Sequence, residues 1–268
     1  MEGKKFSFGK NWQVLLRGLT EERVRIAEHS ITDFLHMKDL EGKSFLDIGC
    51  GSGLFSQAAF NLKARTVVSF DYDPFSVECC NHLKEKSGSP ENWEVYEESV
   101  LDREFTSGLG KFDIVYSWGV LHHTGSMWEA IKNAAELVNK GGFLYITLYN
   151  RTGWPFGSEF WLKVKMLYNS LPDAGKKTME FSYLMSVMFK NFLRLRNPLT
   201  EMKNYKSHRG MSWRTDITDW LGGYPYESAT AEEVTDFMKA NLPGFRLVNI
   251  KRTSSAMGNN WFLFKNGE

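Results

Sequence analysis

The stretch "SFLDIGCGSGLF", residues 44–55, decides the fold of this chain. An apolar run that is typical of a buried strand reaches Asp47, and glycines follow at alternate positions, Gly49, Gly51 and Gly53. A helical pattern begins directly afterwards. A glycine turn between a strand and a helix lets a ligand approach the bare backbone and the free amides of the helix N-terminus. A tight turn that binds no ligand is the alternative.

Two acids beside this turn indicate which ligand it takes. Asp71 closes the next strand-like run, where a carboxylate accepts hydrogen bonds from ribose hydroxyls. Dinucleotide-binding loops carry G-x-G-x-x-G, but here the third glycine comes one residue early and Asp47 precedes the loop. A carboxylate repels a diphosphate at close range. The electrostatics therefore favour S-adenosylmethionine, which carries an ammonium, a sulfonium and a ribose but no phosphate.

Composition places the chain among ordinary globular proteins. It has 268 residues, of which 42% are hydrophobic and 24% charged, and its net charge is +1. Residues 1–150 hold 16 Lys/Arg against 21 Asp/Glu, and residues 151–268 hold 17 against 11. The three cysteines, two of them adjacent, do not suggest a disulfide framework. With no secretory signal and no apolar run long enough to span a membrane, we expect a cytoplasmic protein.

The first half of the chain alternates two patterns. The strand-like runs are 44–48, 66–71, 93–97, 112–118 and 142–149. The helical patterns between them are 53–63, 74–87 and 126–139, the last ending at the glycines of "LVNKGG", 137–142. This alternation predicts an α/β fold, a doubly wound parallel sheet with helices on both faces.

The second half is predicted to be helical over 154–196 and irregular over 196–216, after which the stretch 217–227 carries no assignment. A helix over 230–242 follows, with Thr230 and Glu233 forming a capping box. Runs 245–253 and 260–266 then predict an antiparallel hairpin. The domain boundaries that follow are an N-terminal helical segment and cofactor lid, a cofactor-binding core, a mainly helical insertion for acceptor recognition, and a closing helix with two strands: 1–40, 41–150, 151–229 and 230–268.

Three stretches carry a family resemblance. "FLDIGCGSG" (45–53) resembles the first motif of the class I S-adenosylmethionine-dependent methyltransferases, and "VVSFDYDPFSVECC" (67–80) resembles their second. Residues 112–150 resemble their fourth-strand and fifth-strand region. The group that looks closest includes the ubiquinone-pathway O-methyltransferases. The resemblance implies a Rossmann-like seven-stranded sheet in the order 3-2-1-4-5-7-6, with strand 7 antiparallel and the helical insertion between strands 5 and 6.

The resemblance also implies a cofactor site for S-adenosylmethionine, with S-adenosylhomocysteine as the product. Asp71 would bind the ribose, Tyr72 would flank the adenine, and Asp47 would reach the amino group. Many relatives carry an aspartate where Ser99 stands. The cofactor-binding residues that we predict are Trp12, Asp47, Gly49, Cys50, Gly51, Ser52, Gly53, Asp71, Tyr72, Ser99, Val100, Trp118 and Gly119. Trp12 either covers the cofactor or packs the first helix against the core.

Methyl transfer from a sulfonium is a direct displacement, so the site must mainly align the reactants and exclude water. A base that removes the proton of a hydroxyl acceptor adds ~10²–10⁴-fold. His122 and His123, after the fourth strand, are the candidates for that base, and a structural role in the loop is the alternative. Neither an i,i+4 histidine pair nor a Cys/His spacing predicts a metal site.

The insertion carries the predicted substrate-binding residues, together with the end of the fifth strand: Tyr149, Tyr205, His208, Arg209 and Trp213. Arg209 or Arg214 would bind an anion. The amphipathic stretch 179–196 is predicted to be a lid over a small-molecule pocket or a homodimer contact. The alternatives are peripheral contact with a membrane surface, or nucleic-acid binding through the 12 basic residues of 151–214. The absence of any recognisable RNA module and the near-zero net charge disfavour nucleic acid.

The sequence therefore predicts a cytoplasmic methyltransferase that acts on an oxygen atom of a small molecule. An RNA, lipid-like or quinone acceptor is the alternative within the same chemistry. A protein that binds S-adenosylmethionine as a sensor, without catalysis, is the contrasting class.

Overall fold

A computed structural model provides the structure of the chain. It describes residues 6–16, 18–153, 155–193, 213–255 and 258–267. The side chains of residues 10, 14, 15 and 213–215 lie outside that description.

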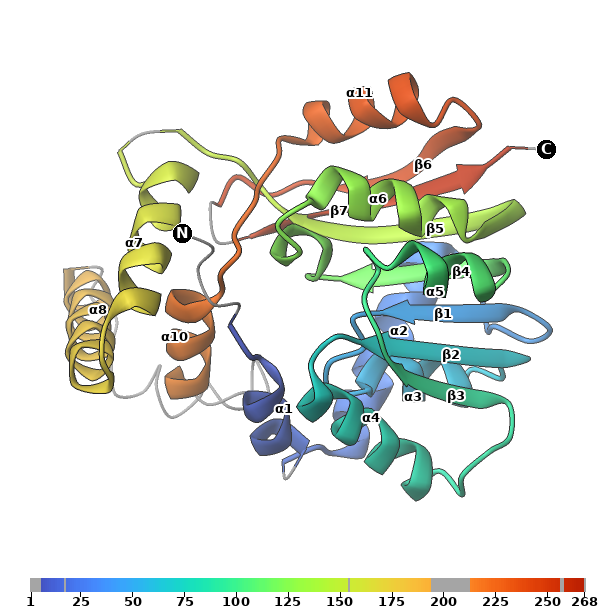
Figure 1. Cartoon of the computed structure of the whole chain (residues 1–268), viewed down its shortest axis with the longest axis horizontal. Coiled ribbons are helices and arrows are strands. Elements are labelled where there is room, and N and C mark those ends of the chain that lie inside the picture. The colour runs from blue at the N-terminus through green and yellow to red at the C-terminus, as the bar shows by residue number, and fades with distance from the viewer. Residues whose placement is uncertain (1–5, 17, 154, 194–212, 256–257, 268) are drawn as a thin grey trace.

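One mixed sheet forms the centre of the molecule (Figure 1). Its strands are β1 (Ser44–Ile48), β2 (Thr66–Asp71), β3 (Trp93–Glu97), β4 (Phe112–Trp118), β5 (Val138–Tyr149), β6 (Phe245–Lys251) and β7 (Asn259–Asn266). Their order is β3-β2-β1-β4-β5-β7-β6. Strands β1 to β5 run parallel, and β7 pairs antiparallel with β5 and β6. The predicted order and the predicted direction of strand 7 are confirmed.

Helices cover both faces of the sheet, because neighbouring strand residues point to opposite sides. Phe45 of β1 belongs to the core formed with α2 (Glu21–Leu35), α3 (Leu54–Asn61) and α4 (Pro74–Lys86). The next residue, Leu46, belongs to the core formed with α6 (Met127–Glu136) and α11 (Ala231–Asn241). Both strand residues are fully buried, as expected for a sheet covered on both faces.

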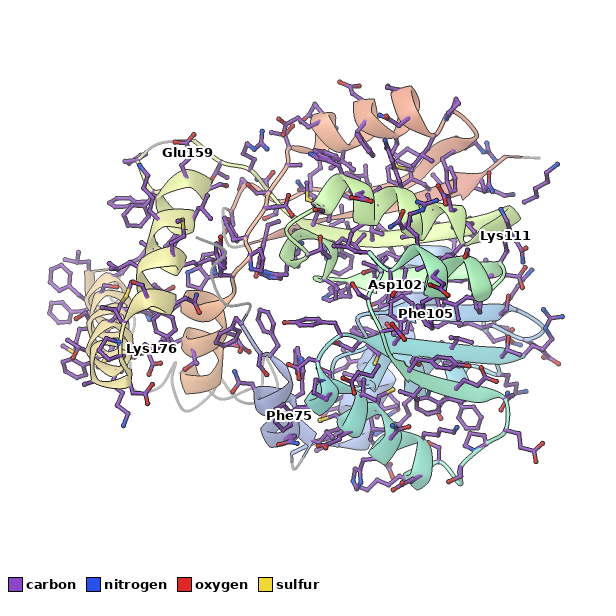
Figure 2. All side chains as sticks on the ribbon, in the orientation of Figure 1. Phe75, Asp102, Phe105, Lys111, Glu159 and Lys176 are labelled. Carbon is purple, nitrogen blue, oxygen red and sulfur yellow. The ribbon has the colours of Figure 1, made fainter. Side chains whose placement is uncertain are left out.

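A short helix that the sequence did not predict closes the second face. Asp102 accepts a hydrogen bond from the Phe105 amide (3.0 Å) and so caps α5 (Arg103–Gly108). Figure 2 shows the side chains of Asp102 and Phe105 on this element. The Phe105 ring packs edge-on against Phe70 of β2, with 5.2 Å between centroids. The helix therefore contributes to the wall beside the end of β2.

The start of β5 differs from the prediction. Helix α6 ends at Glu136 and the strand begins at Val138, so the glycines of 137–142 lie inside the strand rather than at a helix end. The Leu137 carbonyl accepts a hydrogen bond from the Phe112 amide (2.8 Å), which extends the pairing of β4 and β5. A Cβ on Gly142 would lie 2.8 Å from the Asp113 carbonyl oxygen. Glycine is thus present because the backbones approach closely.

The insertion between β5 and β6 is mainly helical, as predicted. It contains α7 (Ser158–Ser170), α8 (Asp173–Leu193) and α10 (Trp213–Gly222), which Figure 1 shows beyond one end of the sheet. Helix α10 begins inside the segment 196–216 that was predicted to be irregular, so that prediction is wrong at residues 213–216, and it continues into a stretch for which no helix was predicted. Its buried residues Ile217, Trp220 and Leu221 recur at helical spacing and pack with Tyr168 of α7 in a separate small core.

The last part of the chain follows its prediction closely. Thr230 Oγ1 accepts from the Glu233 amide (3.1 Å), and a Glu233 carboxylate oxygen accepts from the Thr230 amide (2.7 Å). This capping box starts α11 at Ala231. The expected hairpin of β6 and β7 is also present.

Candidate active site

The glycine turn after β1 is shaped by two positions that have no room for a side chain. Gly49 has φ +72°, and a Cβ there would lie 2.4 Å from Val120 Cγ1. Gly53 has φ +78°, and its Cβ would lie 2.8 Å from the Cα of Cys80. Positive φ already favours glycine, and the backbone contact at Gly53 cannot shift easily. The turn therefore brings its backbone close to both neighbouring elements.

Asp71 fixes this turn from the end of β2. One of its carboxylate oxygens accepts from the Gly51 amide (3.0 Å) and the other from the Asp73 amide (2.9 Å). Burial raises the pKa of Asp71 to about 6, although both amide hydrogen bonds lower it. A carboxylate retains further acceptor positions beyond two hydrogen bonds. Asp71 is thus able to accept from hydroxyl groups at the carboxyl end of β2.

Asp47 has a different environment from the one predicted. A chain of hydrogen bonds runs from Trp93 Nε1 to Ser69 Oγ (3.0 Å), from Ser69 to Ser56 Oγ (2.8 Å), and from Ser56 to Asp47 Oδ2 (2.5 Å). Burial raises the pKa of Asp47 to about 7. Asp47 does not line the cavity described below, and it joins β1 to α3 through Ser56.

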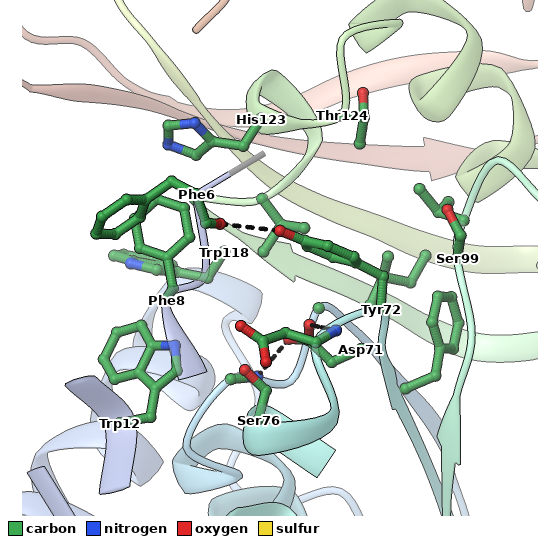
Figure 3. Close-up of a pocket in the computed structure, with 18 of the residues that line it drawn as sticks. Phe6, Phe8, Trp12, Asp71, Tyr72, Ser76, Ser99, Trp118, His123 and Thr124 are labelled. Carbon is green, nitrogen blue, oxygen red and sulfur yellow. Dashed lines mark hydrogen bonds between the residues drawn. The ribbon is translucent and has the colours of Figure 1, made fainter. Parts of the chain in front are cut away.

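A cavity of about 410 Å³ lies at the carboxyl ends of the strands (Figure 3). We call its first side the sheet wall, which comes from β1 to β4 and their loops: Ile48, Gly49, Gly51, Phe70, Asp71, Tyr72, Asp73, Ser76, Glu98, Ser99, Val100, Leu101, Trp118, Gly119 and Val120. We call its second side the outer wall, which comes from six separate parts of the chain: Phe6, Phe8, Trp12, His123, Thr124, Tyr149, Asp216, Asp219, Tyr224 and Asn259.

Most of the predicted cofactor-binding residues meet in this cavity. Those that line it are Trp12, Gly49, Gly51, Asp71, Tyr72, Ser99, Val100, Trp118 and Gly119. Those that do not are Asp47, Cys50, Ser52 and Gly53, all of which belong to the turn or its flanks. The three cysteines, Cys50, Cys79 and Cys80, are free and buried, and Cys80 packs against Gly53 of this turn.

The N-terminal segment 6–16, which contains α1 (Gly9–Leu16), forms part of the outer wall and is hydrogen-bonded to residues of both walls. Ser7 Oγ and the Gly9 amide both donate to Asp73 Oδ2, at 2.7 and 2.9 Å. Tyr72 donates its hydroxyl to the Phe6 carbonyl (2.9 Å), and the Phe6 amide donates to the Tyr224 carbonyl (2.9 Å). Figure 3 shows Phe6, Phe8 and Trp12 facing Asp71 and Tyr72.

The two histidines after β4 occupy different places. They form the short 3-10 helix η1 (Leu121–His123). The His122 ring is fully buried, its Nδ1 accepts from the Tyr149 amide (3.3 Å), and it does not line the cavity. The His123 ring does line the cavity, and its Nδ1 lies 2.6 Å from the Pro225 carbonyl oxygen. Because that oxygen can only accept, Nδ1 carries the proton and Nε2 is an acceptor in the neutral ring.

The outer wall contains residues that the sequence analysis missed. Asp216 and Asp219 of α10 are three residues apart, a spacing that places them on one face of a helix and was visible in "TDITDW". Asn259 reaches the cavity because β7 pairs it with Tyr149. That long-range pairing leaves no local signal.

Of the predicted substrate-binding residues, Tyr149 lines the cavity. Tyr205, His208 and Arg209 lie outside the described residues, as does the side chain of Trp213. The described residues include no cluster of three or more His, Cys, Asp or Glu able to hold a metal ion. Within the same residues, no helix is both long and apolar enough to cross a membrane.

Comparison with known families identifies the chain. A family model described as "Methyltransferase domain" matches residues 19–213, which include the glycine turn, Asp71 and both histidines. The chain belongs to this methyltransferase domain family. Residues 19–213 cover most of the described chain, so the assignment does not depend on the glycine turn alone.

Individual relatives agree with this assignment. The chain is 29% identical over 124 residues to the ubiquinone biosynthesis O-methyltransferase of Methylobacterium sp. (strain 4-46), covering 46% of this chain and 48% of the relative. It is 26% identical over 180 residues to that of Parvibaculum lavamentivorans, covering 60% and 69%. The alignments thus span about half the length of the first of these relatives.

The fold also matches a solved structure, magnesium protoporphyrin IX methyltransferase from Synechocystis PCC 6803 with bound S-adenosylhomocysteine. The TM-score is 0.55 at 13% identity, over 91% of this chain and 83% of that one. The predicted membership of the class I S-adenosylmethionine-dependent methyltransferases is confirmed, and with it the cofactor class.

Proposed function

We propose that this chain transfers a methyl group from S-adenosylmethionine to an oxygen atom of a small molecule, with His123 as the proton acceptor. The observation that carries the proposal is the His123 ring, which lines the cavity with Nδ1 engaged by Pro225 and with Nε2 left as the acceptor nitrogen. The cofactor supplies an activated methyl group, so the residues of this chain have to position the acceptor and take its proton.

The sheet wall fits the cofactor. Gly51 presents bare backbone to the cavity. The Trp12 indole lies close to it, because a Cβ on Gly51 would lie 3.1 Å from the indole nitrogen. Asp71 offers acceptor positions at the end of β2, which is where open α/β sheets bind nucleoside ligands. We therefore propose that Gly49, Gly51 and Asp71 hold the cofactor, with Trp118 beside the methyl group.

The N-terminal segment is proposed to cover the bound cofactor. Trp12 lies over Gly51, and the Phe6 carbonyl oxygen accepts a hydrogen bond from the Tyr72 hydroxyl. Apolar rings above the sheet wall exclude water, which a displacement at a sulfonium requires.

His123 is proposed to accept the proton as the acceptor oxygen is methylated, because a buried ring of low pKa is too weak a base to deprotonate a free hydroxyl, whereas the oxygen becomes strongly acidic as the new C–O bond forms. Burial is the largest cause that lowers the pKa of His123, to about 3, with the charge of Lys165 as a smaller contribution. The ring therefore stays neutral at pH 7, and the Nε2 lone pair is available. The Pro225 carbonyl would in turn stabilise the imidazolium that forms, because it accepts from Nδ1 in both protonation states.

The acceptor is proposed to be small rather than a nucleic acid. A cavity of about 410 Å³ falls in the range of small-molecule sites, and the cofactor takes part of it. Its charged lining consists of the carboxylates Asp71, Asp73, Glu98, Asp216 and Asp219, with no Lys or Arg among the described lining residues. Such a lining repels a polyanion.

The test uses methyl-labelled S-adenosylmethionine and a metabolite extract of the source cells. We expect His123→Ala to lower the rate of label transfer by ~10²–10⁴-fold, the usual contribution of a general base. Affinity for S-adenosylhomocysteine, measured by calorimetry, should stay within about twofold of the wild type because His123 lies in the outer wall.

The matched control is His82→Ala, which removes an exposed histidine of α4 and should change neither quantity. Full transfer by the His123→Ala variant would remove the base assignment. A wild-type protein that binds the cofactor but never transfers label would favour a sensor over an enzyme.

The predicted contacts of 179–196 with a second copy or a membrane surface stay predictions. Helix α8 exposes apolar side chains along one face at helical spacing: Phe181, Met185, Phe189 and Phe192. Apolar rings on that face need a partner surface of some kind. Sedimentation of the protein alone tests for contact with a second copy, and sedimentation with lipid vesicles tests for contact with a membrane surface.

A further inference from the structure

The outer wall combines aromatic rings with carboxylates, and Asp219 is the carboxylate whose surroundings are most fully defined. Asp219 lies on α10, lines the cavity, and comes from a part of the chain far from the glycine turn. Because Gly223, which follows it closely in the chain, packs against His123, we assign Asp219 to the end of the cavity that contains His123.

Two contacts hold Asp219 in place. Its Oδ1 accepts from the side-chain amide of Asn11, which lies on α1, and its backbone carbonyl accepts from the Gly223 amide (2.9 Å). A Cβ on Gly223 would lie 3.2 Å from both His123 Cε1 and Phe8 Cζ. The backbone turn that carries Asp219 thus packs directly against the proposed base.

Asp219 has no cationic partner in the described structure. The ion pairs recorded among those residues, with N and O within 4.0 Å, do not include it: Arg103–Glu136, Arg151–Glu233, Lys239–Asp236 and Arg252–Glu232. Lys165 of α7 is fully buried nearby, but its Nζ donates to the Trp220 carbonyl and lies 4.2 Å from the Trp220 ring centroid. Among the described residues, the side-chain hydrogen bond that Asp219 accepts is the one from Asn11 to Oδ1, and none reaches Oδ2.

The positive charges near Asp219 do not balance the negative charge of its carboxylate. Burial is the largest cause that raises the pKa of Asp219 to about 7, and the like charge of Asp216 adds to it. The Asn11 hydrogen bond and the charge of Lys165 act in the opposite direction. Burial also lowers the pKa of Lys165 to about 7, so that residue is a weak source of positive charge at neutral pH.

Aromatic rings line the same cavity as this carboxylate. Phe6 and Phe8 pack edge to face, with centroids 4.8 Å apart, and Phe8 lies 5.1 Å from the His123 ring. Tyr149 and Tyr224 also line this end. Ring faces attract cations, and a carboxylate among aromatic rings is an arrangement that suits an alkylammonium group.

We propose that the acceptor carries a protonated amino group, which binds Asp219 Oδ2 among these rings while its hydroxyl meets His123. This inference rests on the function proposed above and adds the chemical class of its substrate. Asp219 then determines specificity, because an acceptor with a carboxylate or phosphate at the same place meets an unpaired negative charge. Asn11 is a positioning residue that occupies Oδ1 and leaves Oδ2 for the acceptor.

The experiment separates labelled products by charge. The wild-type protein is incubated with methyl-labelled S-adenosylmethionine and a metabolite extract. The fractions that contain S-adenosylmethionine and S-adenosylhomocysteine are identified with standards and discarded. The remaining label is applied to cation and anion exchangers at pH 5. We expect the transferred label on the cation exchanger. Label that passes through both exchangers, or stays on the anion exchanger, overturns the inference and leaves the methyltransferase proposal intact.

The labelled acceptor is then purified and used with the Asp219→Asn variant, which keeps the shape of the side chain and removes its charge. We expect KM for the acceptor to rise at least tenfold, kcat to change less than threefold, and the affinity for S-adenosylhomocysteine and S-adenosylmethionine to stay within twofold. Asp236→Asn, an exposed carboxylate of α11, is the matched control and should leave all of these values unchanged.

Three results would contradict the role of Asp219. An unchanged KM in Asp219→Asn excludes it from acceptor binding. A loss of S-adenosylmethionine affinity places the carboxylate on the cofactor instead. The absence of labelled product from the wild-type protein overturns the proposed function itself, and this inference with it. Should Asp219→Asn fail to fold, the charge of the wild-type product still decides the substrate class.

Discussion

The two walls of the cavity are built in opposite ways. The sheet wall comes from the ends of β1, β2, β3 and β4 and the short loops that follow them, and these strands are adjacent in one sheet. The outer wall consists of side chains from segments as far apart as Phe6, Tyr149 and Asn259. A shared cofactor needs the same backbone in every relative, whereas an acceptor is recognised by side chains that can change independently.

This difference predicts how each wall responds to mutation. Changes in the sheet wall, or in the glycine turn directly behind it, should affect the fold and cofactor binding together. Changes behind the outer wall should affect local stability and leave cofactor binding in place.

The largest effect is expected for Gly53→Ala. The new Cβ would meet the Cys80 backbone at 2.8 Å in a residue that also has positive φ, so we expect the free energy of unfolding to fall by about 2–4 kcal/mol. Chemical denaturation measures this loss. The matched control is Gly42→Ala, where φ is +75° but no atom lies within 4 Å of the new Cβ. We expect about 1 kcal/mol there, and equal losses in both variants would refute the packing argument.

The second effect is on cofactor affinity. Asp71→Ala removes a buried acceptor and releases the Gly51 amide, so we expect S-adenosylhomocysteine to bind about 10- to 100-fold more weakly, or about 1.4–2.8 kcal/mol. Because the pKa of Asp71 is raised to about 6, wild-type affinity should also decline as the pH falls below that value. Calorimetry measures both. Glu97→Ala, an exposed carboxylate at the end of β3, serves as the control. Unchanged affinity in Asp71→Ala would show that the cofactor lies elsewhere.

The smallest effect is on the stability of the insertion. Lys165 has a folded pKa of about 7, lowered by burial, against about 10.4 in an unfolded chain. Between these two values the unfolded state binds more protons, so the stability of the wild type rises with pH across this window. Lys165→Met lacks this dependence. We expect it to be more stable than the wild type at pH 7 by about 1 kcal/mol, after the lost hydrogen bond to Trp220, and to lose that advantage toward pH 10.

Thermal unfolding at several pH values tests this expectation. Lys163→Met, on the exposed side of the same helix, should show no such window. A difference between Lys165→Met and the wild type that is constant from pH 7 to pH 10 would mean that Lys165 stays charged in the fold.

Much of the sheet wall could be predicted from the sequence. Strands β1 to β4 have the bounds that their apolar runs indicated, and Gly49, Gly51 and Asp71 meet as their spacing predicted. Local patterns determine these features, because each lies within a few residues of a strand end. The surroundings of Asp47 were harder to predict, because its contact with Ser56 depends on how α3 packs on β1.

The outer wall could be predicted only in part. His123 and Tyr149 were named from the sequence, but the different placement of His122 depends on the β5 backbone at Tyr149. Helix α10 was missed because glycines and aromatic residues surround it, while its stability comes from packing on α7. Long-range packing of this kind overrides local propensity.

The buried thiols make the glycine turn measurable. The chain contains only three cysteines, and all of them are free and buried: Cys50 lies in this turn, Cys80 lies against Gly53, and Cys79 precedes Cys80 on α4. A water-borne thiol reagent can reach them only when this part of the molecule opens. The rate at which the native protein is alkylated therefore reports how often the turn and its two neighbouring helices separate, with no label introduced. A ligand that stabilises the turn through Gly51 and Asp71 slows that reaction. The alkylation rate therefore also measures how strongly a bound cofactor protects the turn from opening.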